Sequence, residues 1–105
     1  MKMSFTENGY MTSGFEEEIP LLIQLSLLCA LRKRIIEHPK IDYLQVFKLT
    51  RVTDQYGDVC QKIVHEQEQP RLQDTYTIVT DEAVDKTVFC IDDGDHFTFL
   101  LSEEY

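Results

Sequence analysis

The sequence predicts an α+β domain in which one main helix packs on a mostly antiparallel sheet of about five to six strands. Three observations support this class. One long apolar segment, at residues 16–37, has the flanking residues of a helix. The chain after it is rich in β-branched and aromatic residues, which favour strands. Short groups of turn residues divide that part of the chain, so the expected order of elements is β-α-β-β-β-β-β.

The length and composition describe one globular domain. The 105 residues are enough for a single core, and the apolar content of 43% is ordinary for a folded chain. We therefore expect one domain over residues 1–105, with about residues 1–9 flexible. Residues 10–13 are a candidate edge strand before the helix.

The predicted helix has signals at both ends. Pro20 suits a first helical turn, where its missing N–H would have no partner. Glutamates occupy positions 16–18 and basic residues occupy 32–34, an order that complements the helix dipole. Ser13 stands three residues before the first of these glutamates, which is capping-box spacing and predicts that the chain begins to coil a turn earlier. Pro39 disfavours the helical conformation in the residue before it and marks the end.

The helix is more apolar than a sheet alone requires. In residues 19–31, ten of thirteen side chains are apolar and only Gln24 and Ser26 are polar. One sheet face needs an apolar stripe of about three or four residues per two turns. A membrane span needs about 20 apolar residues, and the polar residues 1–13 lack the apolar core of a signal peptide. We expect a helix buried on two sides in a soluble protein, with the second side covered by a loop or by another copy of the chain.

Strands follow the helix. Residues 42–52 and 59–69 are rich in strand-forming types, and the turn residues between them predict a hairpin. Pro70 ends the second strand because it lacks a donor for the ladder. A short third strand is expected at residues 75–80.

The last predicted hairpin spans residues 86–101. Its centre, Asp93-Gly94, favours a two-residue type I′ turn. This turn would place Cys90 opposite Phe97, on an almost wholly apolar face that should contact the helix. The opposite face is more apolar than a solvated face requires, which makes it a candidate ligand or partner surface; it carries Phe89, Ile91, Thr98, Leu100 and His96.

The cysteines favour a reducing compartment. Cys29, Cys60 and Cys90 are odd in number, far apart, and lie in apolar or strand-like segments. We therefore expect reduced, buried thiols in a cytoplasmic protein, without a disulfide framework or a zinc cluster.

The net charge of −9 lies entirely in the last forty residues. Residues 1–65 hold eight acidic and eight basic side chains, whereas residues 66–105 hold eleven acidic side chains and only Arg71 and Lys86. Direct nucleic-acid binding is disfavoured, because phosphate contacts need Lys and Arg. The simplest interpretation is a solvated acidic surface; the alternatives are docking of a basic partner or mimicry of a nucleic acid.

The first group of candidate site residues is His65, Glu66 and Glu68. Alternation along a strand points His65 away from the two glutamates, so an acid–base pair would need a partner from another strand. A polar strand end is the simplest interpretation, and ligand or partner binding is the alternative.

The second group is Asp92, Asp93 and His96. A calcium loop would need acidic ligands at alternate positions, but a strand begins where those ligands should lie. Turn chemistry explains the aspartates without a metal. We therefore expect no catalytic residue, no metal and no cofactor, and we keep both groups as ligand- or partner-binding candidates.

Four motifs in order carry a resemblance to a known family. They are EEIPL with QL at 17–25, DYLQVF at 42–47, QKIVH with QE and a proline at 61–70, and IDDG with LL and EEY at 91–105. Together they resemble the Gram-positive bacterial family called domain of unknown function 960, over about residues 12–105. The resemblance implies a small intracellular protein and supplies no activity, cofactor or catalytic residue.

These observations predict a small cytoplasmic interaction or regulatory module without catalytic activity. Its surplus apolar surface predicts a homodimer, through the helix or a sheet edge, or an unknown protein partner, with no membrane and no direct nucleic-acid contact. One alternative is a small-ligand-binding protein or enzyme in which His65 and His96 converge on one pocket. Another is an acidic inhibitor of a nucleic-acid-binding protein, with its carboxylates gathered on one face.

Overall fold

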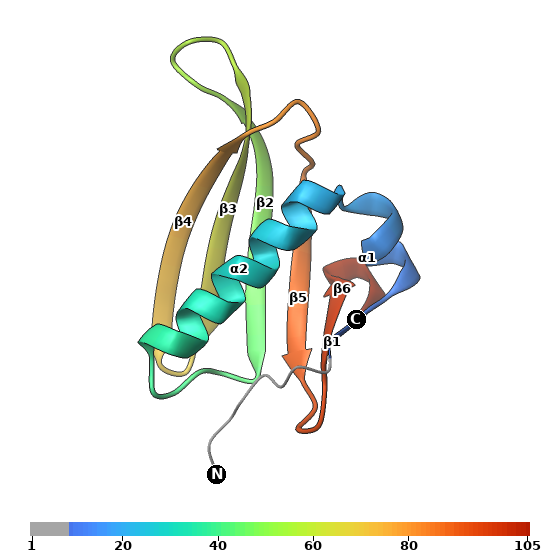
Figure 1. The fold of residues 1–105 in the computed structure, drawn as a ribbon, viewed down its shortest axis with the longest axis vertical. Helices are drawn as coiled ribbons and strands as arrows, with labels where there is room; N and C mark the ends of the chain where they lie inside the picture. The colour runs from blue at the N-terminus through green and yellow to red at the C-terminus, as the bar shows by residue number, and fades with distance from the viewer. Residues whose placement is uncertain (1–8) are drawn as a thin grey trace.

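The computed structural model describes residues 9–105 as a sheet of six strands with two α-helices on one face (Figure 1). Of the segment predicted to be flexible, residues 1–8 lie outside the described residues, and Gly9 begins a strand. In chain order the elements are β1 (Gly9–Met11), α1 (Ser13–Glu18), α2 (Leu21–Glu37), β2 (Leu44–Thr53), β3 (Val59–Glu68), β4 (Arg71–Val79), β5 (Lys86–Asp92), β6 (Phe97–Leu101) and the 3₁₀ helix η1 (Ser102–Glu104).

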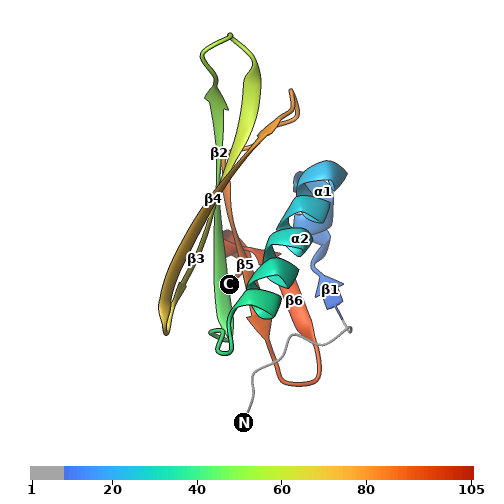
Figure 2. The same ribbon diagram turned by 60° about the vertical axis from the view of Figure 1, so that its left-hand side comes forward.

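The strands lie in the order β1-β6-β5-β2-β3-β4. Neighbouring strands are antiparallel except β1 and β6, which are parallel. The α+β class and the edge strand before the helical segment are therefore confirmed. A view turned by 60° shows both α-helices on the same side of the sheet (Figure 2).

The predicted single helix is two helices, which corrects the expectation for its start. Ile19 and Pro20 are extended, with ψ of 116° and 148°, because a proline disfavours the helical conformation in the residue before it. The glutamates therefore belong to α1, and α2 has no acidic residue in its first turn. The chain does coil a turn earlier, but the capping residue is Thr12, whose hydroxyl accepts the Phe15 N–H at 3.1 Å.

The end of α2 is as predicted. His38 is extended (φ −125°, ψ 133°) immediately before Pro39, and its N–H still donates to the carbonyl of Arg34 at 3.0 Å. In the part of the chain that the structure describes, neither α-helix is long and apolar enough to cross a bilayer.

Strands β2, β3 and β4 form an antiparallel meander. The predicted first hairpin is confirmed, with Thr53 opposite Val59 and a glycine of positive φ (86°) at Gly57 in the turn. The third strand is longer than predicted, because β4 spans Arg71–Val79 and all its residues pair with β3. Its first residues are polar, and their strand conformation follows from pairing with β3 rather than from their own propensity.

The final hairpin forms in a register two residues away from the predicted one. Cys90 lies opposite Phe99, and the Asp93 N–H donates to the carbonyl of His96 at 2.8 Å. Only Gly94 has a positive φ (99°), which excludes the type I′ turn with its two positive angles. Because the shift is an even number of residues, each side chain keeps its predicted face.

The core lies between the sheet and the helices, as predicted for this hairpin face. Phe15 of α1 stacks on Phe99 with ring centroids 5.2 Å apart, and Leu27 of α2 is fully buried. The main contributors from the sheet are Phe47, Leu49, Ile63, Val88, Cys90, Phe97, Phe99 and Leu101.

The opposite face of the hairpin is partly covered by the end of the chain. The ring of Tyr105 packs edge-on against Phe89 with centroids 5.5 Å apart, and Leu100 is buried. Part of the apolar surface predicted on this face is therefore used within the chain.

Candidate functional site

The six residues singled out from the sequence lie in three places: the core under α2, the opposite face of β3, and the turn between β5 and β6. His65 lies in the core under α2, and Glu66 and Glu68 lie on the opposite face of β3. Asp92, Asp93 and His96 lie at the turn between β5 and β6. Alternation along β3 separates the first two places, as the sequence predicted. The third place follows the end of β5.

His65 is a core residue. Its ring is fully buried, stacks on Phe47 with centroids 4.2 Å apart, and places Nε2 2.7 Å from Oε1 of Gln45. Burial, with the nearby charge of Arg34, lowers the pKa of His65 from 6.5 to about 3. The ring is therefore neutral at physiological pH and has no access to a substrate.

Glu66 and Glu68 lie on the side of the sheet away from the helices. Glu66 pairs with Lys48 at 3.3 Å, and both glutamates, with Asp42, line a pocket of about 390 Å³. The Asp42 oxygens already accept two backbone N–H groups, from Leu44 and Gln69. Within residues 9–105, no three His, Cys, Asp or Glu side chains are grouped so that they would hold a metal ion.

Asp92 is the last residue of β5, and Asp93 and His96 lie in the turn that follows it. Asp92 accepts the Gly94 N–H at 2.8 Å, which supports the turn glycine. The two ring nitrogens of His96 lie 3.1 Å from Asp93 and 2.9 Å from Asp95. His65 contacts core residues, whereas His96 contacts carboxylates of the turn. The two histidines therefore do not converge on one pocket, as a ligand or enzyme site would require.

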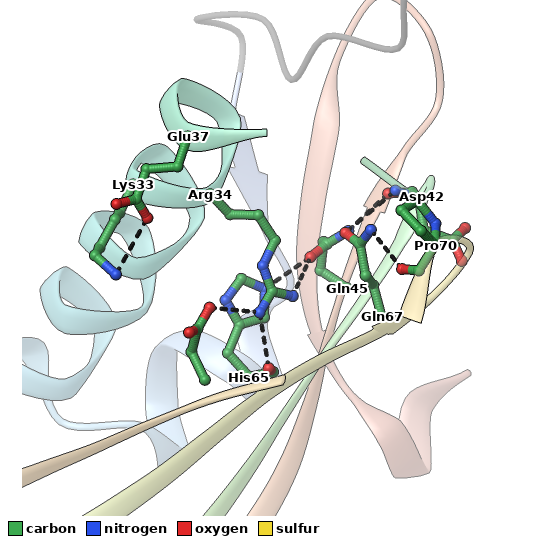
Figure 3. A network of polar contacts seen from close by, with 9 residues as sticks. Lys33, Arg34, Glu37, Asp42, Gln45, His65, Gln67 and Pro70 are labelled. Carbon is green, nitrogen blue, oxygen red and sulfur yellow. Dashed lines mark hydrogen bonds and ion pairs between the residues drawn. The ribbon is translucent and has the colours of Figure 1, made fainter. Parts of the chain in front are cut away.

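A network of buried polar side chains joins α2 to the sheet, and sequence reasoning missed it (Figure 3). Arg34 reaches down from α2 and donates to Oε1 of Gln45 (3.2 Å), the carbonyl of His65 (3.0 Å) and Oδ2 of Asp74 (2.9 Å). Gln45 also donates to Oε1 of Gln67 at 2.8 Å. The available signal was a pair of glutamines at core-facing strand positions.

The network assigns the protonation states of its members. Gln45 gives its amide hydrogens to Gln67 and to the carbonyl of Asp42, so its Oε1 is an acceptor and Nε2 of His65 carries the hydrogen. Nδ1 of His65 is then a bare acceptor, and it has no partner among the described residues. The Arg34 guanidinium lowers the pKa of Asp74, so the two form a charged pair.

Of the two coverings expected for the second side of α2, a loop of the described residues is not found, so this side is open within one chain. Its covering by a second copy of the chain stays a prediction. Leu21, Leu22 and Leu25 expose 68%, 48% and 52% of their surface. Cys29 is exposed too, whereas Cys60 and Cys90 are buried, and all three thiols are free. The expectation that every thiol is buried is therefore wrong for Cys29.

A groove of about 690 Å³ lies beside this open side, between α2 and the edge strand β4. We call it the α2–β4 groove. It is mostly apolar, with one lysine, and is lined by Leu22, Leu25, Ser26, Cys29, Ala30, Lys33, Ile63, Thr75, Tyr76, Thr77 and Ile78. Its existence depends on the crossing of α2 over the sheet, which the Arg34 network positions.

Comparison with known proteins identifies the family. The model of the family described as "Staphylococcal protein of unknown function (DUF960)" matches residues 8–104. The chain belongs to this family. The resemblance carried by the four sequence motifs is thereby confirmed, and the match spans all described strands and helices. No curated protein matches the DUF960 chain.

The DUF960 fold is also similar to a solved structure, titled "Crystal structure of the protein of unknown function from Enterococcus faecalis". The TM-score is 0.75 at 18% sequence identity, covering 100% of this chain and 96% of the other. At this identity the similarity concerns the fold alone.

Most polar groups of the buried network in this DUF960 chain bond to one another, and Asp92 and His96 make contacts within the β5–β6 hairpin. Among the described residues, an apolar surface without an internal partner lies along α2 beside the groove.

Proposed function

We propose that this chain is a non-catalytic interaction module of the cytoplasm that self-associates as a homodimer. The observation that carries the proposal is the open apolar side of α2, where Leu21, Leu22 and Leu25 are exposed and the last two line the α2–β4 groove. Fully burying such a side chain stabilises a complex by about 1.5–3 kcal/mol. A dissociation constant near ~1 μM, the scale we expect, requires about 8 kcal/mol after the entropy lost on association is offset, so further contacts must add to those of the leucines.

The placement of the titratable groups favours binding over catalysis. His65 is neutral inside the core, and the ring nitrogens of His96 face carboxylates of their own turn. The buried Cys90 thiol has a raised pKa because of desolvation, which opposes a nucleophilic role. Free thiols fit a reducing cytoplasm.

The alternative of an acidic inhibitor is less well supported. The eleven carboxylates of residues 66–105 are scattered over both sides of the sheet, two loops and the C-terminal segment. Several are used internally: Asp74 pairs with Arg34, Glu103 with Lys86, and Glu104 accepts the Leu101 N–H. This arrangement lacks the single acidic face that mimicry of a nucleic acid requires.

Sedimentation velocity between ~0.1 and ~100 μM tests the proposal, since this range brackets the expected dissociation constant. We expect wild-type protein to shift from monomer to dimer, and Leu22→Asp with Leu25→Asp to remain monomeric. Ile36→Asp is the matched control, because Ile36 is exposed on the same helix but does not line the groove. A wild-type monomer at ~100 μM would remove the homodimer.

A further inference from the structure

The two edges of the sheet differ in a way that bears on association. In the described residues, the β1 edge is three residues long, whereas the β4 edge is nine residues long. Native proteins protect sheet edges with short strands, bulges, lysine or proline. β4 contains no lysine or proline, and its one-to-one pairing with β3 leaves no bulge. The charge of Asp74 is bound by Arg34, and the other charge of the strand, Arg71, stands at its first residue, so the edge from residue 72 to residue 79 lacks the usual protection against pairing.

The hydrogen-bond pattern between β3 and β4 shows which backbone groups of β4 face the open edge. The Thr80 N–H donates to the carbonyl of Val59 at 3.1 Å, and these two residues continue the β3–β4 register. Bonded pairs alternate along an antiparallel ladder, so the even-numbered residues of β4 bond to β3. Gln73, Thr75 and Thr77 therefore present their N–H and C=O groups outward.

We infer that a second copy of this chain pairs with this edge, β4 against β4 in antiparallel orientation, with Thr75 opposite Thr75 of the second copy. The inference rests on the proposed self-association and specifies its interface. An antiparallel pairing of one strand with its own copy has a two-fold axis, as closed dimers require. The two sheets become one continuous sheet of twelve strands, since each copy contributes six.

The register follows from side-chain complementarity. Centring on Thr75 places Asp74 opposite Tyr76 of the second copy, and Leu72 opposite Ile78. Centring one residue earlier places Asp74 opposite its own copy, where like charges repel. Centring one residue later places Asp74 opposite the apolar Ile78. Only the first register keeps apolar side chains together and the carboxylate beside a hydroxyl.

The α2–β4 groove joins this edge to the open side of the helix. Tyr76 and Ile78 line the groove and project from the same face of β4 as Asp74, which Arg34 of α2 holds. The corresponding side chains of the second copy would project on that face too, next to the groove. The edge, the groove and the exposed leucines thus form one continuous surface for a single occupant.

Cysteine cross-linking in a Cys29→Ser background tests the register, because Cys29 is an exposed thiol. Residues opposite each other in a bonded pair have Cα atoms about 5.5 Å apart, within the range of a disulfide. We expect Thr75→Cys to form a disulfide-linked dimer by itself. Gln73→Cys and Thr77→Cys should each fail alone, because their copies lie about 13 Å apart, and should cross-link when mixed.

A proline substitution tests the edge itself. Thr75→Pro removes an N–H that points away from β3, so the fold should keep its ladder while the dimer is lost. Thr77→Lys should raise the dimer dissociation constant about tenfold or more, and Thr53→Lys, an exposed strand residue outside the edge, should leave it unchanged. Thermal unfolding at ~0.1 μM, where the monomer predominates, checks that each variant is folded.

Three outcomes decide between the possibilities. Self-linking of Thr75→Cys, together with a folded monomeric Thr75→Pro, supports the β4 interface. A wild-type dimer that persists in Thr75→Pro and Thr77→Lys, without self-linking, overturns this interface and leaves the proposed self-association intact. A strictly monomeric wild-type chain at ~100 μM overturns both, and the open edge would then be available to a strand of a different protein.

Discussion

Arg34 carries a positive charge into the core, where its two terminal nitrogens find acceptors and Nε has none among the described residues. Gln45, the carbonyl of His65 and the carboxylate of Asp74 are these acceptors. Removing one partner of a buried charge leaves the other incompletely compensated, which costs more than the pair contributes. We infer that the network fixes how α2 crosses the sheet more than it adds to overall stability.

The Arg34–Asp74 pair makes a first prediction. Asp74→Asn should lower the free energy of unfolding by about 1–2 kcal/mol, the lower part of the range for charged hydrogen bonds, because Asp74 is partly exposed. The pKa of Asp74 is depressed in the folded protein, so its contribution is present above the unfolded pKa and disappears as the pH falls through the folded one. Urea unfolding should show wild type and variant converging in acid. Asp81→Asn, at the surface, is the control.

His65 predicts a second dependence on pH. Its pKa is about 3 in the folded protein and near 6.5 when unfolded, so below pH 6.5 only the unfolded chain takes up this proton. The free energy of unfolding should fall as the pH is lowered from about 6.5 towards 3, with a slope approaching 1.4 kcal/mol per pH unit.

His65→Gln should remove this part of the slope, as measured by urea unfolding at a series of pH values. His96→Gln, which changes a histidine of the turn, should retain it. An unchanged slope in His65→Gln would contradict the neutral buried ring.

At the scale of elements, α2 has one buried and one open side. Leu27 is fully buried against the sheet, whereas Leu25, two residues earlier, exposes half of its surface beside the groove. A helix apolar on both sides is stable in one chain because the inner side alone contributes to folding. The outer side is available for association.

This contrast gives a third prediction. Leu27→Ala should lower the free energy of unfolding by about 2–5 kcal/mol, because it leaves a cavity in the core. Leu25→Ala should change it by about 0.5 kcal/mol or less at protein concentrations where the monomer predominates. Chemical unfolding followed by tyrosine fluorescence at ~0.1 μM, below the expected dissociation constant, measures both. Equal losses would mean that the second side of α2 is already covered within the chain.

The elements also show which local signals were sufficient. The first hairpin and the end of α2 formed as predicted, because turn residues and Pro39 act over a few neighbours. Pro20 is also a local signal, but we expected it in the first turn of one helix. In the structure it stands between α1 and α2, immediately before Leu21. The first half of β4 and the register of the last hairpin had no sufficient local signal, since pairing with a neighbouring strand decides both.

At the scale of the whole molecule, self-association should increase the stability of the folded chain. Because a dimer is a bound state of the folded chain, the midpoint of thermal unfolding should rise with protein concentration. For a dissociation constant of ~1 μM, the folded chain gains about 0.4 kcal/mol at ~1 μM and about 1.6 kcal/mol at ~100 μM, because the free monomer and not the total chain drives association. Calorimetry at several concentrations measures this shift.

Thr75→Pro provides the comparison for this measurement. If the β4 edge is the interface, its midpoint should not depend on concentration. A concentration-dependent midpoint in this variant would place the interface elsewhere on the molecule.

The sequence alone determined the α+β class, the order of strands along the chain and the faces of their side chains. These follow from periods of 2 and 3.6 residues and from turn chemistry, which are local properties. The tertiary structure alone decided which residues meet: Arg34 with Gln45 and Asp74, and α2 with the β4 edge. Such contacts join segments that are tens of residues apart in the sequence. They depend on strand register and on how the helix crosses the sheet, and the period of the side chains gives no information about either.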